Sequence, residues 1–154
     1  MRQVVLAFTF AVACGFAVLT APSAHAATFV NATVGNTGPC LEVRGANIST
    51  GIVQAFTCNG TFAQQWNFEG SVIQGLGSTS SGAKCLDVLA NGTANGTRVD
   101  ITSCNGTTAQ SWTYSGGRLI GTHSGKCLTA GALGTQVTIQ TCNGTAGQFW
   151  SIRS

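Results

Sequence analysis

The stretch Cys40-Leu41-Glu42-Val43 opens a pattern that returns as Cys85-Leu86-Asp87-Val88 and again as Cys127-Leu128-Thr129-Ala130. Each opening is followed by a Cys-Asn-Gly-Thr sequence, at residues 58–61, 104–107 and 142–145. Each unit then closes on Gln-x-Trp, and the closing tryptophans are Trp66, Trp112 and Trp150. The chain therefore repeats one unit three times, and such repetition predicts a fold with pseudo-threefold symmetry.

The N-terminal segment has the pattern of a secretory signal peptide. Arg2 supplies a positive charge, Val4 to Leu19 is mostly apolar, and Ala24-His25-Ala26 resembles a cleavage sequence of small residues. The apolar run is shorter than the roughly 20 residues of a membrane span. A lipid anchor on Cys14 is disfavoured because the apolar run continues past it. We expect residues 1–26 to be removed, which leaves a secreted, extracellular chain of residues 27–154.

The cysteines of the mature chain predict disulfides. Removal of the leader takes one cysteine of the seven, and an even number in an exported chain indicates three bridges. Many pairings are possible, but the repeat favours joining each opening cysteine to the next one, as 40–58, 85–104 and 127–142. A zinc site is not expected, because there is no Cys-x-x-Cys pair and His123 is the only mature histidine. No cofactor is implied.

Local sequence patterns indicate strands and turns throughout. The segments Ser71–Gln74, Arg98–Ile101 and Gln136–Ile139 alternate polar with apolar residues, which is the period of half-buried strands. Asn-Gly turn dipeptides begin at residues 59, 91, 95, 105 and 143. No stretch after the leader keeps a helical period, so the fold class is all-β.

The three Gln-x-Trp sequences, together with the Cys-Leu-acid-Val openings, resemble the ricin B-chain-type lectin domain. The resemblance covers essentially all of residues 27–154 and implies a β-trefoil of three four-stranded repeats. The repeats are expected at approximately 27–69, 70–115 and 116–154. This domain also serves as a carbohydrate-binding module on secreted glycosidases.

The Gln-x-Trp residues themselves are expected to be structural. A tryptophan at one phase of every repeat suits a pseudo-threefold core, and the family buries it. The glutamines Gln64, Gln110 and Gln148 are expected to bond to backbone groups that would otherwise be buried without partners. Sugar binding must then come from other positions.

The resemblance implies a sugar pocket in each repeat. In the family, the acid of the opening acts with a polar residue four positions before the second cysteine and an aromatic residue two positions before it. An asparagine immediately before the Gln of Gln-x-Trp completes the pocket. A fixed acid can accept hydrogen bonds from two sugar hydroxyls, and a nearby ring can cover the apolar C–H face of the sugar.

Transferred to this chain, the first repeat offers Glu42, Gln54 and Phe56, although Ala63 replaces the asparagine and the longer acid must sit differently. The second and third repeats depart further from the pattern. The second has Asp87, Asp100, Thr102 and Ala109 at these positions, and the third has Thr129, Thr138, Gln140 and Gly147. The predicted carbohydrate-binding residues are therefore Glu42, Gln54, Phe56, Asp87 and Asp100.

The second pocket carries two acids that are expected to face one hollow. Adjacent carboxylates repel one another unless a positive charge lies between them. One hypothesis is that this pocket prefers a cation, either Ca²⁺ or an amino sugar such as glucosamine. The alternative is that Asp87 and Asp100 are two solvated acids at a strand edge.

The charge content disfavours other functions. Charged residues make up 7 % of the chain, with seven Lys+Arg against four Asp+Glu, and the basic residues are scattered singly. A nucleic-acid partner is therefore not expected. A single mature histidine gives no Ser-His-Asp constellation. Asp87 with Asp100 is the only candidate carboxyl pair for a glycosidase, and a trefoil pocket is shallow.

The sequence thus predicts a secreted, non-catalytic lectin that binds glycans or polysaccharide reversibly through shallow pockets. Two weak pockets on one rigid body gain strength by avidity on a polymer or cell surface. The alternative is a β-trefoil that has lost its sugar sites and acts as a protein-interaction or inhibitor module through its loops.

Overall fold

The computed structural model describes residues 27–31, 38–75 and 84–154. The predicted signal peptide, residues 1–26, lies outside the described residues. Within the part that is described, no helix is long and apolar enough to cross a membrane. The described chain forms strands joined by turns and by short 3-10 helices, as an all-β fold requires.

The strands form three four-stranded sheets whose connections follow the repeat. The sheet orders are β13-β1-β3-β4, β5-β6-β7-β8 and β12-β11-β10-β9, and neighbouring strands within each sheet are antiparallel. The strands are β1 (Thr28–Asn31), β3 (Cys40–Val43), β4 (Val53–Phe56), β5 (Trp66–Glu69), β6 (Val72–Gly75), β7 (Lys84–Val88), β8 (Val99–Ser103), β9 (Trp112–Ser115), β10 (Arg118–Gly121), β11 (Cys127–Thr129), β12 (Thr138–Gln140) and β13 (Trp150–Arg153).

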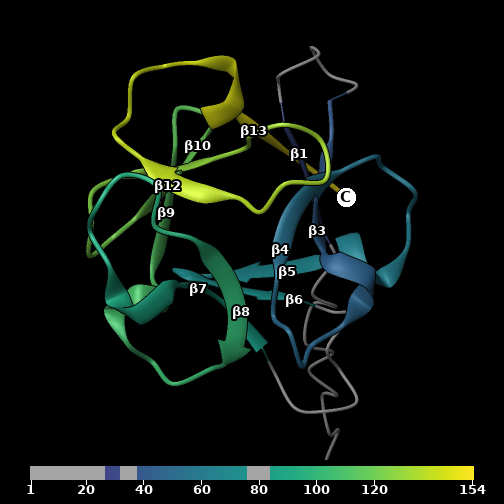
Figure 1. Ribbon diagram of the computed structural model, residues 1–154, viewed down its shortest axis with the longest axis horizontal. Coiled ribbons are helices and arrows are strands. Elements are labelled where there is room, and N and C mark those ends of the chain that lie inside the picture. Colours follow the sequence, from purple (N-terminus) through teal and green to yellow (C-terminus); the bar gives the residue numbers. More distant parts are fainter. Residues whose placement is uncertain (1–26, 32–37, 76–83) are drawn as a thin grey trace, which may run out of the picture.

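Each sheet combines the last strand of one repeat with strands of the next. Strand β5 closes the first repeat and pairs with β6 of the second, while the final strand β13 pairs with β1 and so closes the circle. Figure 1 shows the three repeats around a central axis, with the first in blue, the second in teal and green, and the third in yellow-green. This confirms the predicted β-trefoil, whereas the predicted repeat boundaries remain predictions.

The closing tryptophans lie in the core, as predicted. Trp66, Trp112 and Trp150 are at most 1 % exposed. Their indole nitrogens donate to the carbonyl oxygens of the leucines in the three openings, at 2.9, 2.9 and 3.0 Å. Each tryptophan thus fills the core while its polar atom is satisfied, which explains why the repeats share it.

The glutamines of Gln-x-Trp fix the loop that follows each second cysteine. Their Oε1 atoms accept from the backbone nitrogens of Asn59, Asn105 and Asn143 at 2.8, 2.8 and 2.9 Å. Their Nε2 atoms donate to backbone carbonyls of residues 57, 103 and 141 at 2.8, 3.0 and 2.9 Å. These bonds confirm the structural role expected for the three glutamines.

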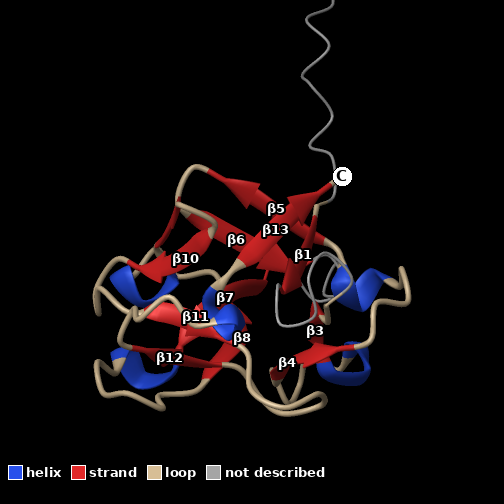
Figure 2. Ribbon diagram, turned by 90° about the horizontal axis from the view of Figure 1, so that it is seen from above, coloured by secondary structure: helices blue, strands red, loops and turns tan. Residues whose placement is uncertain are grey.

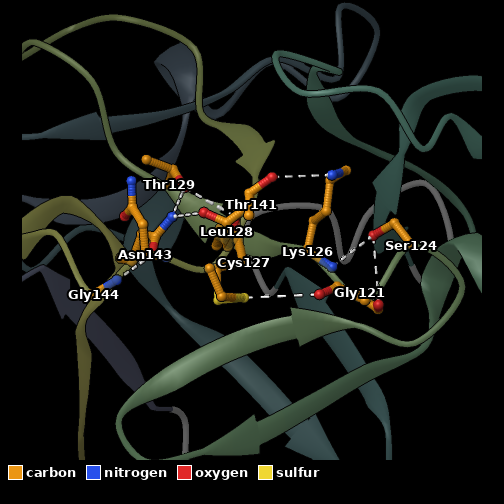
Figure 3. The surroundings of a disulfide bond; sticks show 12 residues. Gly121, Ser124, Lys126, Cys127, Leu128, Thr129, Thr141, Asn143 and Gly144 are labelled. Atoms are coloured by element: carbon orange, nitrogen blue, oxygen red, sulfur yellow. Dashed lines mark hydrogen bonds between the residues drawn. A yellow bond between two sulfur atoms is a disulfide. The ribbon is translucent and has the colours of Figure 1, made fainter.

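The three predicted disulfides are present, as Cys40–Cys58, Cys85–Cys104 and Cys127–Cys142. Each joins the opening strand of a repeat to the loop fixed by the glutamine. Figure 3 shows the third bridge, beside which Lys126 donates to the hydroxyl of Thr141 at 3.3 Å. The disulfide and the glutamine therefore hold the same loop from two sides.

The hairpins of the three repeats also meet one another. Backbone bonds join Val137 to Val53 (3.0 Å), Val99 to Val137 (3.0 Å) and Ile101 to Gly51 (2.7 Å). Figure 2 shows strands β4, β8 and β12 towards one end of the molecule and β1, β5, β6 and β13 towards the other. Each hairpin is therefore braced by a neighbouring repeat as well as by its own.

Candidate functional site

The predicted site residues come together because the hairpin strands pair in the expected register. Glu42 lies opposite Gln54 on β3 and β4, and Asp87 lies opposite Asp100 on β7 and β8. A 3-10 turn before each Gln-x-Trp lies beside the hairpin, η2 (Phe62–Gln64) in the first repeat and η5 (Thr108–Gln110) in the second. The space between hairpin and turn forms a hollow in each of these repeats.

The first hollow has a volume of about 710 Å³ and contains all three predicted residues of the first repeat. Its lining consists of Glu42, Arg44, Gly45, Ala46, Gln54, Phe56, Asn59, Thr61, Phe62, Ala63 and Gly134. Phe56 is 38 % exposed, so its ring remains available to a ligand. The structure therefore places the predicted acid, amide and aromatic ring of the first repeat in the same hollow.

Glu42 is more deeply buried than the strand pattern indicated. It is only 4 % exposed, although alternation placed it on the face opposite Leu41 and Val43. One carboxylate oxygen accepts from Gln54 Nε2 at 2.7 Å, and the other accepts from Gln64 Nε2 at 2.8 Å. The longer acid reaches both amides, and they satisfy one acceptor site on each of its oxygens.

Arg44 extends this network to the wall of the first hollow. Its Nε donates to Gln54 Oε1 at 2.7 Å, and its Nη2 donates to the carbonyl oxygen of Gly134 at 2.8 Å. Sequence reasoning missed both residues. The position of Arg44 directly after the Cys-Leu-Glu-Val opening was an available signal, whereas Gly134 belongs to another repeat and gave none.

Phe62 is a second aromatic residue of the first hollow, and it was not predicted from the sequence. It begins the η2 turn and is 71 % exposed, which makes it the most exposed large hydrophobic side chain of the described residues. Its place two residues before Gln64, within the repeated unit, was a signal that could have identified it. The first hollow thus has two exposed rings.

The second hollow is smaller, about 400 Å³, and contains both predicted acids. Its lining consists of Asp87, Leu89, Ala90, Asn91, Asp100, Thr102, Asn105, Thr107 and Ala109. Asp87 is buried at 8 % exposure, and Asp100 is partly buried. None of the described residues that line this hollow is aromatic.

The two acids of the second hollow affect one another. Burial raises the pKa of Asp87, and a hydrogen bond with Gln110 opposes that shift. Burial and the neighbouring charge of Asp87 raise the pKa of Asp100 to about 6, with partial compensation from Arg98 and a backbone hydrogen bond. The pair is thus not simply solvated, because removal from water and mutual repulsion both disfavour its full ionisation.

The third repeat has replaced these polar groups by local contacts. The hydroxyl of Thr129 donates to the carbonyl of Cys127 at 2.9 Å, and Gln140 donates to the hydroxyl of Thr138 at 3.2 Å. The amide of Gln148 also donates to the hydroxyl of Thr129 at 3.3 Å, and Figure 3 shows Thr129 and Asn143 on the same side of the disulfide in that view. A side chain at Gly147 would place its Cβ 2.6 Å from the carbonyl oxygen of Ala130, which excludes the family's asparagine there.

The described residues contain no group of three or more His, Cys, Asp or Glu side chains that could hold a metal ion. Another hollow of about 520 Å³ lies between β6 and η5 and contains none of the five predicted residues. The arrangement as a whole can form hydrogen bonds to a polar ligand and contact its apolar faces, which suits a sugar.

Comparison with known proteins agrees with this geometry. Residues 28–150 match the family model described as ricin-type beta-trefoil lectin domain. A designed threefold-symmetric protein, ThreeFoil, is similar in structure, with 26 % identity and a TM-score of 0.71 over 84 % of this chain and 98 % of that one. No curated protein sequence matches the chain.

Two plant proteins are also similar. One is a non-toxic homologue of type II RIPs from Momordica charantia (bitter gourd), in complex with α-methyl-D-galactoside, with 27 % identity and a TM-score of 0.67 over 83 % of this chain. The other is the agglutinin from Abrus precatorius, with 22 % identity and a TM-score of 0.69 over 86 % of this chain. This chain spans 47 % and 50 % of their respective lengths. With the family model covering residues 28–150, the chain belongs to the family of ricin-type β-trefoil lectin domains.

Proposed function

We propose that this protein is a secreted, non-catalytic lectin that binds glycans or polysaccharide reversibly through the first and second hollows. The observation that carries the proposal is the first hollow, where Glu42, Gln54 and Phe56 line one surface. An exposed ring beside fixed polar groups is the arrangement by which proteins bind the two chemically different faces of a sugar.

The similar structures support a sugar as the ligand class. The bitter gourd protein is in complex with α-methyl-D-galactoside, and a β-trefoil lectin of the Vibrio vulnificus hemolysin/cytolysin has N-acetyl-D-lactosamine bound. The latter shares 22 % identity and a TM-score of 0.63 with this chain. We propose that Asp87 and Asp100 form a second, weaker site, so that the protein gains strength by avidity on a repeating polymer.

We propose secretion on the basis of the predicted leader at residues 1–26, and three disulfides are compatible with an extracellular protein. We propose a non-catalytic role because the one carboxylate pair among the candidate residues, Asp87 with Asp100, shares a single small hollow. A glycosidase needs two carboxyls on opposite sides of the scissile bond.

The second candidate function is a scaffold that has lost its sugar sites and binds or inhibits another protein. The replacement of the family's asparagine by Ala63 and Ala109 favours it, as does Gly147 at that position of the third repeat, where a Cβ would meet the carbonyl oxygen of Ala130 at 2.6 Å. Phe62, at 71 % exposure, would then contact a protein partner.

The test is binding of the mature chain to a panel of soluble glycans and insoluble polysaccharides, with site variants alongside. Phe56→Ala is the first-hollow variant, because the exposed ring can be removed with little effect on folding. Loss of ring contact is expected to weaken binding about tenfold. Asp100→Ala is the second-hollow variant, and Ile152→Ala, which removes a comparably exposed apolar side chain outside both hollows, is the control.

Binding by the parent and the control that falls in the site variants would support the lectin proposal. A folded sample with three disulfides that binds no glycan in the panel would contradict it and favour the scaffold. Binding that both site variants retain in full would show that the hollows are not the sites.

A further inference from the structure

The first hollow carries chemistry that its counterpart in the second repeat lacks. Phe56 and Phe62 are 38 % and 71 % exposed, and Thr102 and Thr108 occupy the equivalent positions. Phenylalanine side chains are normally buried, and exposed ones close together can mark a surface that contacts an apolar part of a ligand. These two exposed rings in one hollow, Phe56 from β4 and Phe62 from η2, offer apolar surface to the C–H faces of a pyranose.

Arg44 adds a positive charge to the same hollow, where the second repeat has Leu89. The guanidinium presents five N–H donors in a fixed plane. Its two hydrogen bonds within the described residues go to neutral acceptors, the amide oxygen of Gln54 and the carbonyl oxygen of Gly134. They orient the group and leave donors for a ligand.

The negative charge of Glu42 lies beneath this surface. The carboxylate is 4 % exposed, and each of its oxygens accepts a hydrogen bond from a glutamine amide. Arg44 is exposed by contrast. A ligand that enters the first hollow therefore meets the positive group at the surface, while the negative group is already bonded to the protein.

The wall that holds Arg44 is fixed by backbone bonds between two repeats. Gly134 N donates to Ala55 O at 2.8 Å, and Val137 N donates to Val53 O at 3.0 Å. The guanidinium is thus held from β4 on one side and from the third repeat on the other. Such support lowers the entropic cost of ordering the side chain when a ligand binds.

We propose that the first hollow binds an anionic sugar residue, with the pyranose ring on Phe56 and Phe62 and the oxyanion on Arg44. The oxyanion is the carboxylate of a hexuronate or the sulfate of an esterified sugar. A guanidinium binds a carboxylate through two parallel N–H···O bonds, and such charge-assisted bonds are the stronger kind. This inference deepens the proposed function and rests on it, because it names the ligand class of the same hollow.

The experiment compares polymers that differ only in charge. Polygalacturonate is paired with its methyl ester, and dextran sulfate is paired with dextran, each titrated into the mature chain by calorimetry. The parent is expected to bind at least one charged polymer about tenfold more tightly than its neutral partner. The preference should weaken when the salt concentration rises from about 0.05 M to about 0.5 M.

Two variants locate the effect. Arg44→Gln is expected to remove the preference for the charged polymer, and Phe62→Ala to weaken binding of any polymer that the parent binds. Arg153→Gln removes the same charge from another exposed position and is expected to keep the preference. Thermal unfolding of each variant verifies that the fold is retained, and Arg44→Lys, which keeps the charge without the planar donor pair, is expected to give an intermediate preference.

The outcomes separate this inference from the proposed function. Equal affinity for charged and neutral polymers, or a preference that survives Arg44→Gln, overturns the inference while the lectin proposal stands. If the protein binds other glycans but none of these four polymers, the inference is likewise overturned and the lectin proposal stands. Absence of binding to every glycan tested overturns both. Binding of only one charged polymer decides between carboxylate and sulfate.

Discussion

The first and second hollows occupy equivalent places in two repeats and share three lining positions, yet they differ in charge, in volume and in aromatic content. Both lie between a disulfide-linked hairpin and a 3-10 turn, with paired residues at the same register. The first is about 710 Å³ with an acid bonded to amides, and the second about 400 Å³ with two acids facing one another. The pairs that differ most in charge or aromatic character are Arg44/Leu89, Gln54/Asp100, Phe56/Thr102 and Phe62/Thr108.

This comparison separates what builds the fold from what recognises a ligand. The residues common to both repeats, the cysteines, the opening leucine, the glutamine and the tryptophan, are all used in bridges and buried hydrogen bonds. The charged and aromatic residues that differ line the hollows, beside three shared positions, Asn59/Asn105, Thr61/Thr107 and Ala63/Ala109. The same backbone fold therefore carries two hollows of different charge, and substitutions in each hollow can measure that difference.

The largest expected effect is on stability, from removal of the acid in the first hollow. Glu42→Ala leaves the amides of Gln54 and Gln64 without their buried acceptor, and we expect the free energy of unfolding to fall by about 3 kcal/mol. Asp87→Ala removes one member of a repelling pair and should cost much less. Urea unfolding of both variants measures the difference. Equal losses of unfolding free energy in the two variants would show that Glu42 and Asp87 stabilise the fold to the same extent, which would contradict this expectation.

A smaller effect on stability is expected at Gly147 of the third repeat, where a Cβ has no space. Gly147→Ala places a Cβ 2.6 Å from the carbonyl oxygen of Ala130, so backbone must shift, and we expect a loss of about 2 kcal/mol. The matched control is Gly131→Ala, whose Cβ would meet only the hydroxyl of Thr135, at 2.8 Å. Chemical denaturation should show a clearly smaller loss for the control. A Gly147→Ala protein as stable as the parent would show that the backbone at Ala130 or Gly147 shifts without a cost in stability.

Next comes the charge pair of the second hollow. The pKa of Asp100 is raised to about 6 in the folded protein from 3.8, so the folded state holds its proton at higher pH than the unfolded chain. The free energy of unfolding therefore falls as the pH rises through that interval. Asp100→Gln, which copies the pairing of the first hollow, is expected to remove this loss. The gain at about pH 7.5 should be about 1 kcal/mol or less, because the pair is partly exposed.

The same variant should give almost no gain near pH 4, where the parent already carries the proton. Thermal unfolding across this pH range is the measurement. A pH-independent gain would show that the packing of the new side chain, rather than the removal of charge, stabilises the variant.

The smallest effect concerns ligand charge in the second hollow. If Asp87 and Asp100 favour a cationic sugar, Asp100→Asn should weaken binding of a glucosamine oligomer by about threefold, the size expected of a partly exposed ion pair. The N-acetylated oligomer, which has no charge, is the control. Unchanged binding of the glucosamine oligomer would refute the preference and leave the two hollows alike in this respect.

Several features of the fold and the site were predictable because they depend on repetition and local pattern. The three disulfides, the buried tryptophans and the backbone-bonded glutamines all follow from residues that recur in phase. The pairing of Glu42 with Gln54 and of Asp87 with Asp100 followed from the same phase, since equivalent hairpins keep one register. The burial of Glu42 was not predictable from strand alternation, because the η2 turn covers the face that alternation assigns to solvent.

The sequence by itself determined the all-β class, the threefold repeat, the bridges and the positions of the candidate acids, because each is written in the spacing of a few residue types along the chain. Tertiary structure alone decided that Gly134 of the third repeat accepts a hydrogen bond from Arg44 of the first. It also decided that the charge of Glu42 is buried whereas that of Arg44 is exposed. These relations join residues distant in sequence, and their depth depends on how the turn packs over the hairpin. The spacing of residues along the chain predicts neither the contact nor the difference in burial, because both arise only when the three repeats pack against one another.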